Sequence, residues 1–299
     1  MVESVGRFKD DASRERFLSA FDRAMAAWPA RVDHRVETRF GSTVASTVRD
    51  SGDGAPVVLL QGGGSTVAAW APFVHSWSAA RPVIAIDTVW DAGRSIQTRP
   101  VADGADAAAW LDEVLAGFGV DHAHLVGYSY GGWLALNQAV HRPERLRSVT
   151  AIEPPATITG MPIAAWWRML RMLFGDERQY RSYLAWVRGG RLPESDMLEL
   201  LLAAHAGFAQ RGSPRPRRLT AEQWSNITIP LSVVLGGRSR FIETSAAVAT
   251  LRRDASEADV QVMPDASHAV LVDEPDHLID SVRRFTSHHD HGSLRSGRS

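Results

Sequence analysis

Cysteine is absent from the 299-residue sequence, which excludes disulfides, thiolate metal sites and cysteine nucleophiles. The sequence also lacks an uninterrupted apolar run of about 18 residues, the length that a membrane-spanning helix requires. Its first residues, MVESVGRFKDDASRERF, contain no apolar stretch of the kind found in a secretory signal. These absences predict a cytoplasmic protein with no membrane partner.

Neither sign of charge is in excess, because 33 Lys and Arg residues are matched by 34 Asp and Glu residues and the formal net charge is -1. No global positive field attracts the phosphate backbone of a nucleic acid, so we expect no nucleic-acid partner. The hydrophobic and charged fractions, 44% and 22%, are typical of a soluble globular protein. The length favours one domain with an insertion, present as a monomer or a homodimer.

Short continuous apolar runs alternate with helical stretches, a pattern typical of a mostly parallel sheet covered by helices on both faces. Residues 34–49 alternate instead and are rich in Val and Thr, which predicts an antiparallel hairpin at a sheet edge, turned near Gly41. The sequence therefore predicts an α/β fold. The predicted strands span 56–61, 82–87, 122–126, 146–152, 229–235 and 259–263, and the helices lie near 66–80, 103–117, 131–141, 244–253 and 275–287.

The alternation is interrupted at residues 155–226, which carry helical patterns without a strand signal. We predict an α/β core formed by 34–154 and 227–287, a helical cap over 155–226, and a helical lead-in over 1–33. The polar, Gly- and Ser-rich residues 288–299 predict a disordered tail. Its three histidines offer a metal-binding alternative, but a solvated tail is favoured and no metal site is predicted.

The strongest chemical signal is the sequence Gly-Tyr-Ser-Tyr-Gly at 127–131, between an apolar strand and a helical run. A serine on a sharp strand-to-helix turn has an exposed hydroxyl, and small flanking residues let neighbouring backbone approach it closely. The helix that follows directs its positive N-terminus at a developing oxyanion. Ser129 is therefore the candidate nucleophile.

A serine hydroxyl needs a general base within hydrogen-bond reach. His268 follows the last predicted strand and precedes the final helix, so it lies at the same edge of the sheet as Ser129, where parallel strands end. We predict that His268 is the base. The backbone N–H of Tyr130 and that of Gly63, with Gly62 as the alternative, are the predicted donors to the oxyanion. The run Gly62–Gly64 does not fit the pattern G-x-G-x-x-G, so a dinucleotide site is disfavoured and no cofactor is expected.

These motifs resemble the α/β-hydrolase family across about residues 35–287, through QGGG, DTVWDAGRS, LVGYSYGGWLAL, a return strand ending LGG, and DASHAVLVDEP. The resemblance is greatest to bacterial cofactor-free hydrolases with a helical cap. It implies an eight-stranded, mostly parallel sheet, a catalytic triad and a lid. Many relatives carry His at the position of Gln61, so the hydrogen bonds that brace this loop are expected to differ.

The acid of the triad is the main departure from the family pattern, because its usual position, after the penultimate strand, holds Ser239. Glu153 is the first candidate, since it follows the strand next to that of Ser129 and the order Ser129, Glu153, His268 is that of the family. Glu243, at a predicted helix start, is the second candidate. The absence of any triad acid is the third alternative. Asp87 and Asp91 are expected to brace loops, with Arg94 pairing Asp87.

The cap region is rich in aromatic residues and methionine, a composition that suits the wall of an apolar substrate pocket. We expect the substrate-binding residues to be Gln61, Gly62, Tyr128, Trp166, Trp167 and Trp186. The predicted function is hydrolysis of an ester or related acyl bond in a small to medium apolar substrate through a Ser129 acyl-enzyme. Two alternatives remain: a cofactor-free lyase or elimination enzyme in natural-product tailoring, and a non-catalytic small-molecule binding protein.

Overall fold

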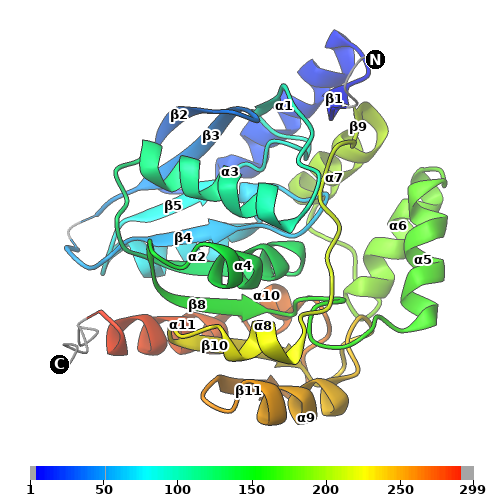
Figure 1. The fold of residues 1–299 in the computed structure, drawn as a ribbon. Helices are drawn as coiled ribbons and strands as arrows, with labels where there is room; N and C mark the ends of the chain where they lie inside the picture. Colours follow the sequence, from blue (N-terminus) through cyan, green and yellow to red (C-terminus); the bar gives the residue numbers. More distant parts are fainter. Residues whose placement is uncertain (1–4, 51, 291–299) are drawn as a thin grey trace.

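A computed structural model of the protein describes residues 5–50 and 52–290, whose central feature is a twisted, mostly parallel sheet (Figure 1). The strand order is β11-β10-β8-β7-β4-β5-β3-β2, with a short β6 beside β3. Neighbours from β11 to β5 are parallel, whereas β3 pairs antiparallel with β5, β2 and β6. The strands are β2 (Val32–Thr38), β3 (Gly41–Val48), β4 (Val57–Leu60), β5 (Val83–Ile86), β6 (Ile96–Gln97), β7 (Ala123–Tyr128), β8 (Leu146–Ile152), β10 (Leu231–Gly236) and β11 (Asp259–Met263).

Both faces of the sheet are covered, and this explains why its central strands are continuously apolar. Side chains along β4 and β5 alternate between two buried clusters: Leu60 and Ile86 pack on one face, Leu59 and Ala85 on the other. The first face is covered by α3 (Gly104–Gly117), α4 (Tyr130–His141), α8 (Ala221–Ser225) and α9 (Thr244–Asp254). The second is covered by α1 (Asp11–Met25), η1 (Val67–Trp70), α2 (Ala71–Ser78), α10 (Val270–Asp273) and α11 (Pro275–His288).

The predicted α/β architecture is confirmed, including the six parallel strands and the hairpin that turns at Gly41. Three short strands were not predicted: β6, and the antiparallel pair of β1 (Arg7–Phe8) and β9 (Phe208–Ala209), of which β9 lies inside the region expected to hold no strand. Two-residue strands have too little length for periodicity to reveal them. Within the predicted helical lead-in, α1 begins at Asp11, because the Asp10 side chain accepts the Ser13 N–H and caps the helix.

The helices of the predicted cap are α5 (Ile163–Leu173), α6 (Glu177–Val187) and α7 (Ser195–Gly207). Figure 1 shows α5 and α6 side by side, standing apart from the sheet and its covering helices. α7 packs against α1, so the lead-in and the cap region form a continuous layer.

The C-terminal residues depart from the predicted tail over 288–290. α11 includes His288, and the Asp290 carboxylate accepts two hydrogen bonds from Arg81 at 2.8 and 2.7 Å. The rest of the predicted tail, 291–299, lies outside the described residues. Within 5–50 and 52–290, no helix has both the length and the apolar character needed to cross a membrane, and no group of three or more His, Asp or Glu side chains is arranged for a metal.

Candidate active site

Ser129 lies where the backbone turns sharply from β7 into α4. Its φ of 53° and ψ of -117° belong to a region that non-glycine residues rarely adopt, and such strain is concentrated at functional positions. The flanking glycines leave no room for a side chain. A Cβ on Gly127 would lie 2.0 Å from the Gly131 carbonyl oxygen, and one on Gly131 would lie 2.1 Å from that of Leu60. The Ser129 hydroxyl is thus fixed at the carboxyl end of β7.

The imidazole of His268 lies between a hydroxyl and a carboxylate. Its Nε2 is 3.0 Å from Ser129 Oγ, and its Nδ1 is 2.7 Å from Glu153 Oε2. His268 comes from the loop between β11 and α10, and only 4% of its surface is exposed. Three residues distant in sequence therefore form one hydrogen-bonded row, which we call the Ser129–His268–Glu153 row.

Glu153 follows β8 directly and is fully buried. Its Oε1 accepts the Gly236 N–H at 2.7 Å, and its Oε2 accepts the Ser239 hydroxyl at 2.5 Å as well as facing His268 Nδ1. A carboxylate accepts hydrogen bonds only, so it favours the His268 tautomer that carries its proton on Nδ1. Nε2 is then free to accept the Ser129 proton. The Glu153 backbone has a φ of 50°, a second strained position in the row.

Of the two carboxylates considered from the sequence, the structure brings Glu153 and not Glu243 to His268. Glu243 instead caps α9, where its carboxylate accepts hydrogen bonds from Ser245 Oγ at 2.8 Å and Ala246 N–H at 2.7 Å. These bonds, the Ser245 hydroxyl first, hold the pKa of Glu243 below its usual range. Ser239 occupies the position where the family pattern places the acid. Its hydroxyl donates to Glu153, which follows the neighbouring strand β8.

The loop Gly62–Gly64 follows β4 and lies against the strand-to-helix turn. A Cβ on Gly62 would lie 3.4 Å from Ser129 Cβ, and one on Gly63 would lie 3.4 Å from Tyr130 Cβ. Within the described residues, the backbone N–H groups of Tyr130 and Gly63 donate to no other residue. Both amides are therefore available to a ligand beside Ser129.

Buried polar side chains brace this loop from below. Gln61 is 2% exposed, and its Nε2 donates to Thr88 Oγ1 at 3.2 Å, so it faces the protein rather than a substrate as first expected. The Thr88 hydroxyl donates to Asp91 Oδ2 at 2.8 Å, and the Gly64 N–H donates to Asp91 Oδ1 at 3.3 Å. The expected pair of Asp87 and Arg94 is present at 3.1 Å. Burial raises the pKa of Asp87 in spite of this pairing.

Two residues that hold the His268 loop were not assigned this role from the sequence. The Tyr128 hydroxyl donates to the His268 carbonyl oxygen at 3.0 Å, a backbone contact, whereas a substrate contact was predicted. Asp273 Oδ2 accepts the N–H and the hydroxyl of Ser267 at 2.7 and 2.5 Å, and Oδ1 pairs with Arg191 after α6. An acid five residues after a histidine gives no signal that periodicity could detect.

The three cap tryptophans occupy different environments. Trp186 is half-buried and lies 5.5 Å from the Phe241 ring, which in turn lies 4.4 Å from the His268 ring, measured between centroids. Trp166 and Trp167, 54% and 61% exposed, are instead on the outer face of α5. The helical pattern identified an apolar face correctly but could not show that this face of α5 is turned to solvent.

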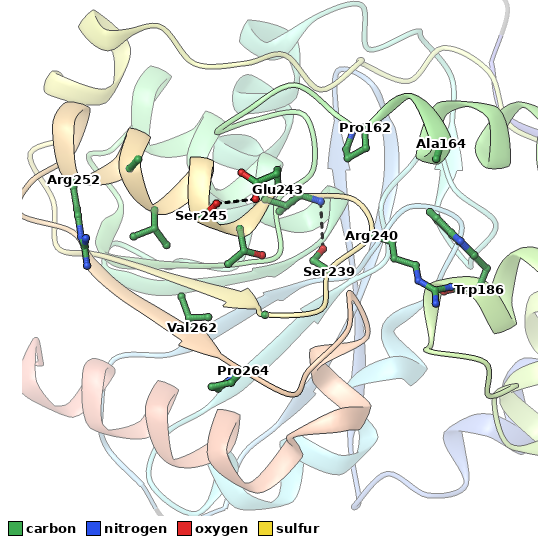
Figure 2. A pocket seen from close by; sticks show the side chains of 15 residues that line it. Pro162, Ala164, Trp186, Ser239, Arg240, Glu243, Ser245, Arg252, Val262 and Pro264 are labelled. Carbon is green, nitrogen blue, oxygen red and sulfur yellow. Dashed lines mark hydrogen bonds between the residues drawn. The ribbon is translucent and has the colours of Figure 1, made fainter.

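A surface groove of about 990 Å³ runs beside the site, along α9 and the end of β11 (Figure 2). Ser239 and Trp186 line it, and Figure 2 shows Arg240 next to Trp186, consistent with a 5.6 Å distance from the guanidinium carbon to the ring centroid. Ser129 and His268 are not among the lining residues. The groove adjoins the row at Ser239, whose hydroxyl donates to Glu153.

Comparisons of the sequence and the fold with known proteins identify the family of this chain. The chain is 25% identical over 296 residues to carboxylesterase YbfK of Bacillus subtilis, covering 95% of this chain and 98% of that protein. It is 24% identical to the uncharacterized carboxylesterase nap of the same organism, covering 90% and 92%.

A solved structure of naproxen esterase from Bacillus subtilis has a TM-score of 0.83 and 22% identity, covering 91% of this chain and 97% of that chain, and supports the fold alone. The family model described as alpha/beta hydrolase family matches residues 57–280, which include every member of the Ser129–His268–Glu153 row. The chain belongs to the α/β-hydrolase family.

Proposed function

We propose that this chain is a serine carboxylesterase that cleaves esters of small to medium apolar substrates through an acyl-enzyme on Ser129. It is an esterase-like member of its family, in keeping with the carboxylesterases to which it is similar over nearly its whole length. The single observation that carries the proposed mechanism is the unbroken Ser129–His268–Glu153 row, with distances of 3.0 and 2.7 Å.

In the acylation step, Ser129 Oγ attacks the ester carbonyl carbon while His268 Nε2 takes the hydroxyl proton. Glu153 remains ionised and stabilises the resulting imidazolium. The negative oxygen of the tetrahedral intermediate accepts hydrogen bonds from the N–H groups of Tyr130 and Gly63. Collapse breaks the bond to the leaving alkoxy group, which receives its proton from His268, and an alcohol departs.

Deacylation repeats the same proton transfers with water as the nucleophile. His268 takes one water proton while the oxygen attacks the acyl carbon, and the second tetrahedral intermediate uses the same amides. Collapse releases a carboxylic acid and returns the proton to Ser129 Oγ. Ester and water are consumed, alcohol and acid are formed, and no redox step occurs, so the row needs no cofactor for this reaction.

An apolar substrate is favoured by the rings beside the base. Phe241 packs against His268, and Trp186 and Tyr183 of α6 pack edge-on against Phe241, at 5.5 and 6.4 Å between centroids. Apolar side chains near a polar centre exclude water and strengthen the electrostatic interactions of the transition state.

The elimination alternative was motivated by the serine at the usual acid position. Because Glu153 reaches His268 from the neighbouring strand, the imidazole has the counter-charge that Ser239 cannot supply. The missing acid therefore no longer argues for elimination, and acyl transfer is the function that the geometry supports best.

Hydrolysis of p-nitrophenyl esters of increasing acyl length tests the proposal. We expect turnover with short and medium chains and a loss of about 10⁵-fold or more in kcat for Ser129→Ala, because the covalent step is removed. Ser245→Ala, at the exposed start of α9, is the matched control and should retain wild-type turnover. An intact wild-type protein inactive on every ester, or a Ser129→Ala variant as active as wild type, would contradict the proposal.

A further inference from the structure

Asp91 is a buried carboxylate that the proposed mechanism leaves unused. It follows β5 and is 3% exposed. Its Oδ1 accepts the Gln210 side-chain amide at 2.7 Å and the Gly64 N–H at 3.3 Å, and its Oδ2 accepts the Thr88 hydroxyl at 2.8 Å. Every one of these partners donates, the pattern that an ionised carboxylate requires.

The environment of Asp91 differs from that of the neighbouring buried aspartate. Asp87 has the Arg94 guanidinium as its counter-ion at 3.1 Å, whereas Asp91 forms no salt bridge within the described residues. A buried charge without a counter-ion depends on hydrogen bonds for its stabilisation. The pKa of Asp91 is raised to about 6: burial is the largest cause and the Asp87 charge adds to it, while the hydrogen bonds from Thr88, Gly64 and Gln210 act in the opposite direction.

The three donors come from parts of the chain that meet near Ser129. Gly64 ends the glycine loop, in which Gly62 and Gly63 lie against Ser129 and Tyr130. Gln210 follows β9 directly, which connects it to the cap region on one side and to β1 on the other. Asp91 thereby connects the glycine loop, which contains the proposed oxyanion donor Gly63, to the cap region.

We propose that Asp91 is a positioning residue for acyl transfer: its ionised carboxylate holds Gly64 and Gln210 together and so fixes the Gly63 amide beside Ser129. This rests on the proposed esterase function. The carboxylate contacts no reacting atom and acts through the glycine loop. Its hydrogen bonds are charge-assisted, so they weaken when Asp91 is protonated or replaced by an amide of the same shape.

The consequence is a second proton in the acid limb of the pH profile. Protonation of Asp91 near pH 6 adds one proton to the number that inactivates the enzyme. The other titratable groups that face Asp91 are the carboxylate of Asp87, paired with Arg94, and the phenols of Tyr130 and Tyr180. Burial raises the pKa of both phenols, so they stay neutral across this range.

The test is Asp91→Asn, which keeps the shape and removes the charge. We expect kcat at pH 8 to fall roughly 10- to 100-fold with a smaller change in KM, because a misplaced donor affects the transition state more than substrate binding. Near and below pH 6 the slope of log(kcat/KM) against pH should be steeper in wild type than in Asp91→Asn, by up to one, because the variant lacks the Asp91 proton. Asp280→Asn, which removes an exposed carboxylate of α11, is the matched control and should follow wild type.

Gln210→Leu provides a second variant, at an exposed position where a substitution disturbs the core less than one at Asp91. With one donor gone, the acid limb should move to higher pH. Acid limbs with the same slope and the same midpoint in wild type and in both variants would overturn the inference even if kcat fell, because a merely structural role changes the rate without changing the position of the limb or the number of protons. Wild-type protein that is folded but inactive on all esters would overturn the esterase proposal itself, and this inference with it.

Discussion

The acid of the row reaches His268 from β8, one strand away from the position that the family pattern suggests. Its site is completed by Ser239, which occupies that usual position and donates to Glu153 at 2.5 Å. Glu153 thus has three hydrogen-bond partners, Gly236, Ser239 and His268, while fully buried. A buried carboxylate with this many donors remains available as a fixed negative charge for the imidazolium.

Glu153→Gln should lower kcat by about 10⁴, because a neutral amide cannot stabilise the imidazolium and allows the wrong His268 tautomer. Glu243→Gln is the matched control, with the same chemical change at a helix cap, and should leave kcat within a factor of about two while slightly lowering stability. Steady-state kinetics and thermal melting of both variants measure this. Equal kcat values for the two variants would show that Glu153 is not the acid.

At the scale of elements, the parallel strands could be predicted because β4, β5, β7, β8 and β10 are buried on both faces and are therefore mostly apolar, β4 and β5 without interruption. The strand-to-helix turn could also be predicted, because its glycines lie at fixed spacing around Ser129. The orientation of the apolar face of α5 could not be predicted. An amphipathic pattern states that a helix has an apolar face, but only packing decides whether that face points inward.

The strand-to-helix turn itself can be tested through Gly131→Ala. A Cβ there would lie 2.1 Å from the Leu60 carbonyl oxygen, so β4 and α4 must separate. We expect the free energy of unfolding to fall by at least about 2 kcal/mol, together with a loss of activity. Gly160→Ala is the matched control, because a Cβ at Gly160 meets no atom within 4 Å. Chemical denaturation of the two variants compares them, and equal stabilities would contradict the described packing.

At the scale of the whole molecule, Asp290, which follows α11, binds side chains of the sheet region far from the Ser129–His268–Glu153 row. Arg81 and His124 both contact the Asp290 carboxylate, and the other ring nitrogen of His124 lies 2.7 Å from Ser148 Oγ. Burial lowers the pKa of His124 from its ordinary 6.5 to about 4, with a smaller opposing effect from Asp290. The unfolded chain therefore binds more protons than the folded chain between these two pH values.

Stability should consequently fall as the pH is lowered from about 6.5 towards 4, with a contribution from His124 of roughly 3 kcal/mol over the full range. His124→Gln should be less stable than wild type at pH 8 but lose less stability between pH 7 and 5. Replacement of the exposed His122 by Gln is the matched control and should keep the wild-type slope. Denaturation midpoints across this pH range measure the effect, and identical slopes for His124→Gln and wild type would refute the assignment.

The measurement that tests the account most directly is mass spectrometry of the protein after reaction with a fluorophosphonate, which labels an activated serine. The Ser129–His268–Glu153 row predicts one adduct per chain, located on Ser129, and none in Ser129→Ala. It also predicts much slower labelling in His268→Asn, because the base is lost. A folded wild-type protein that stays unlabelled, or an adduct on another serine while ester hydrolysis proceeds, would contradict it.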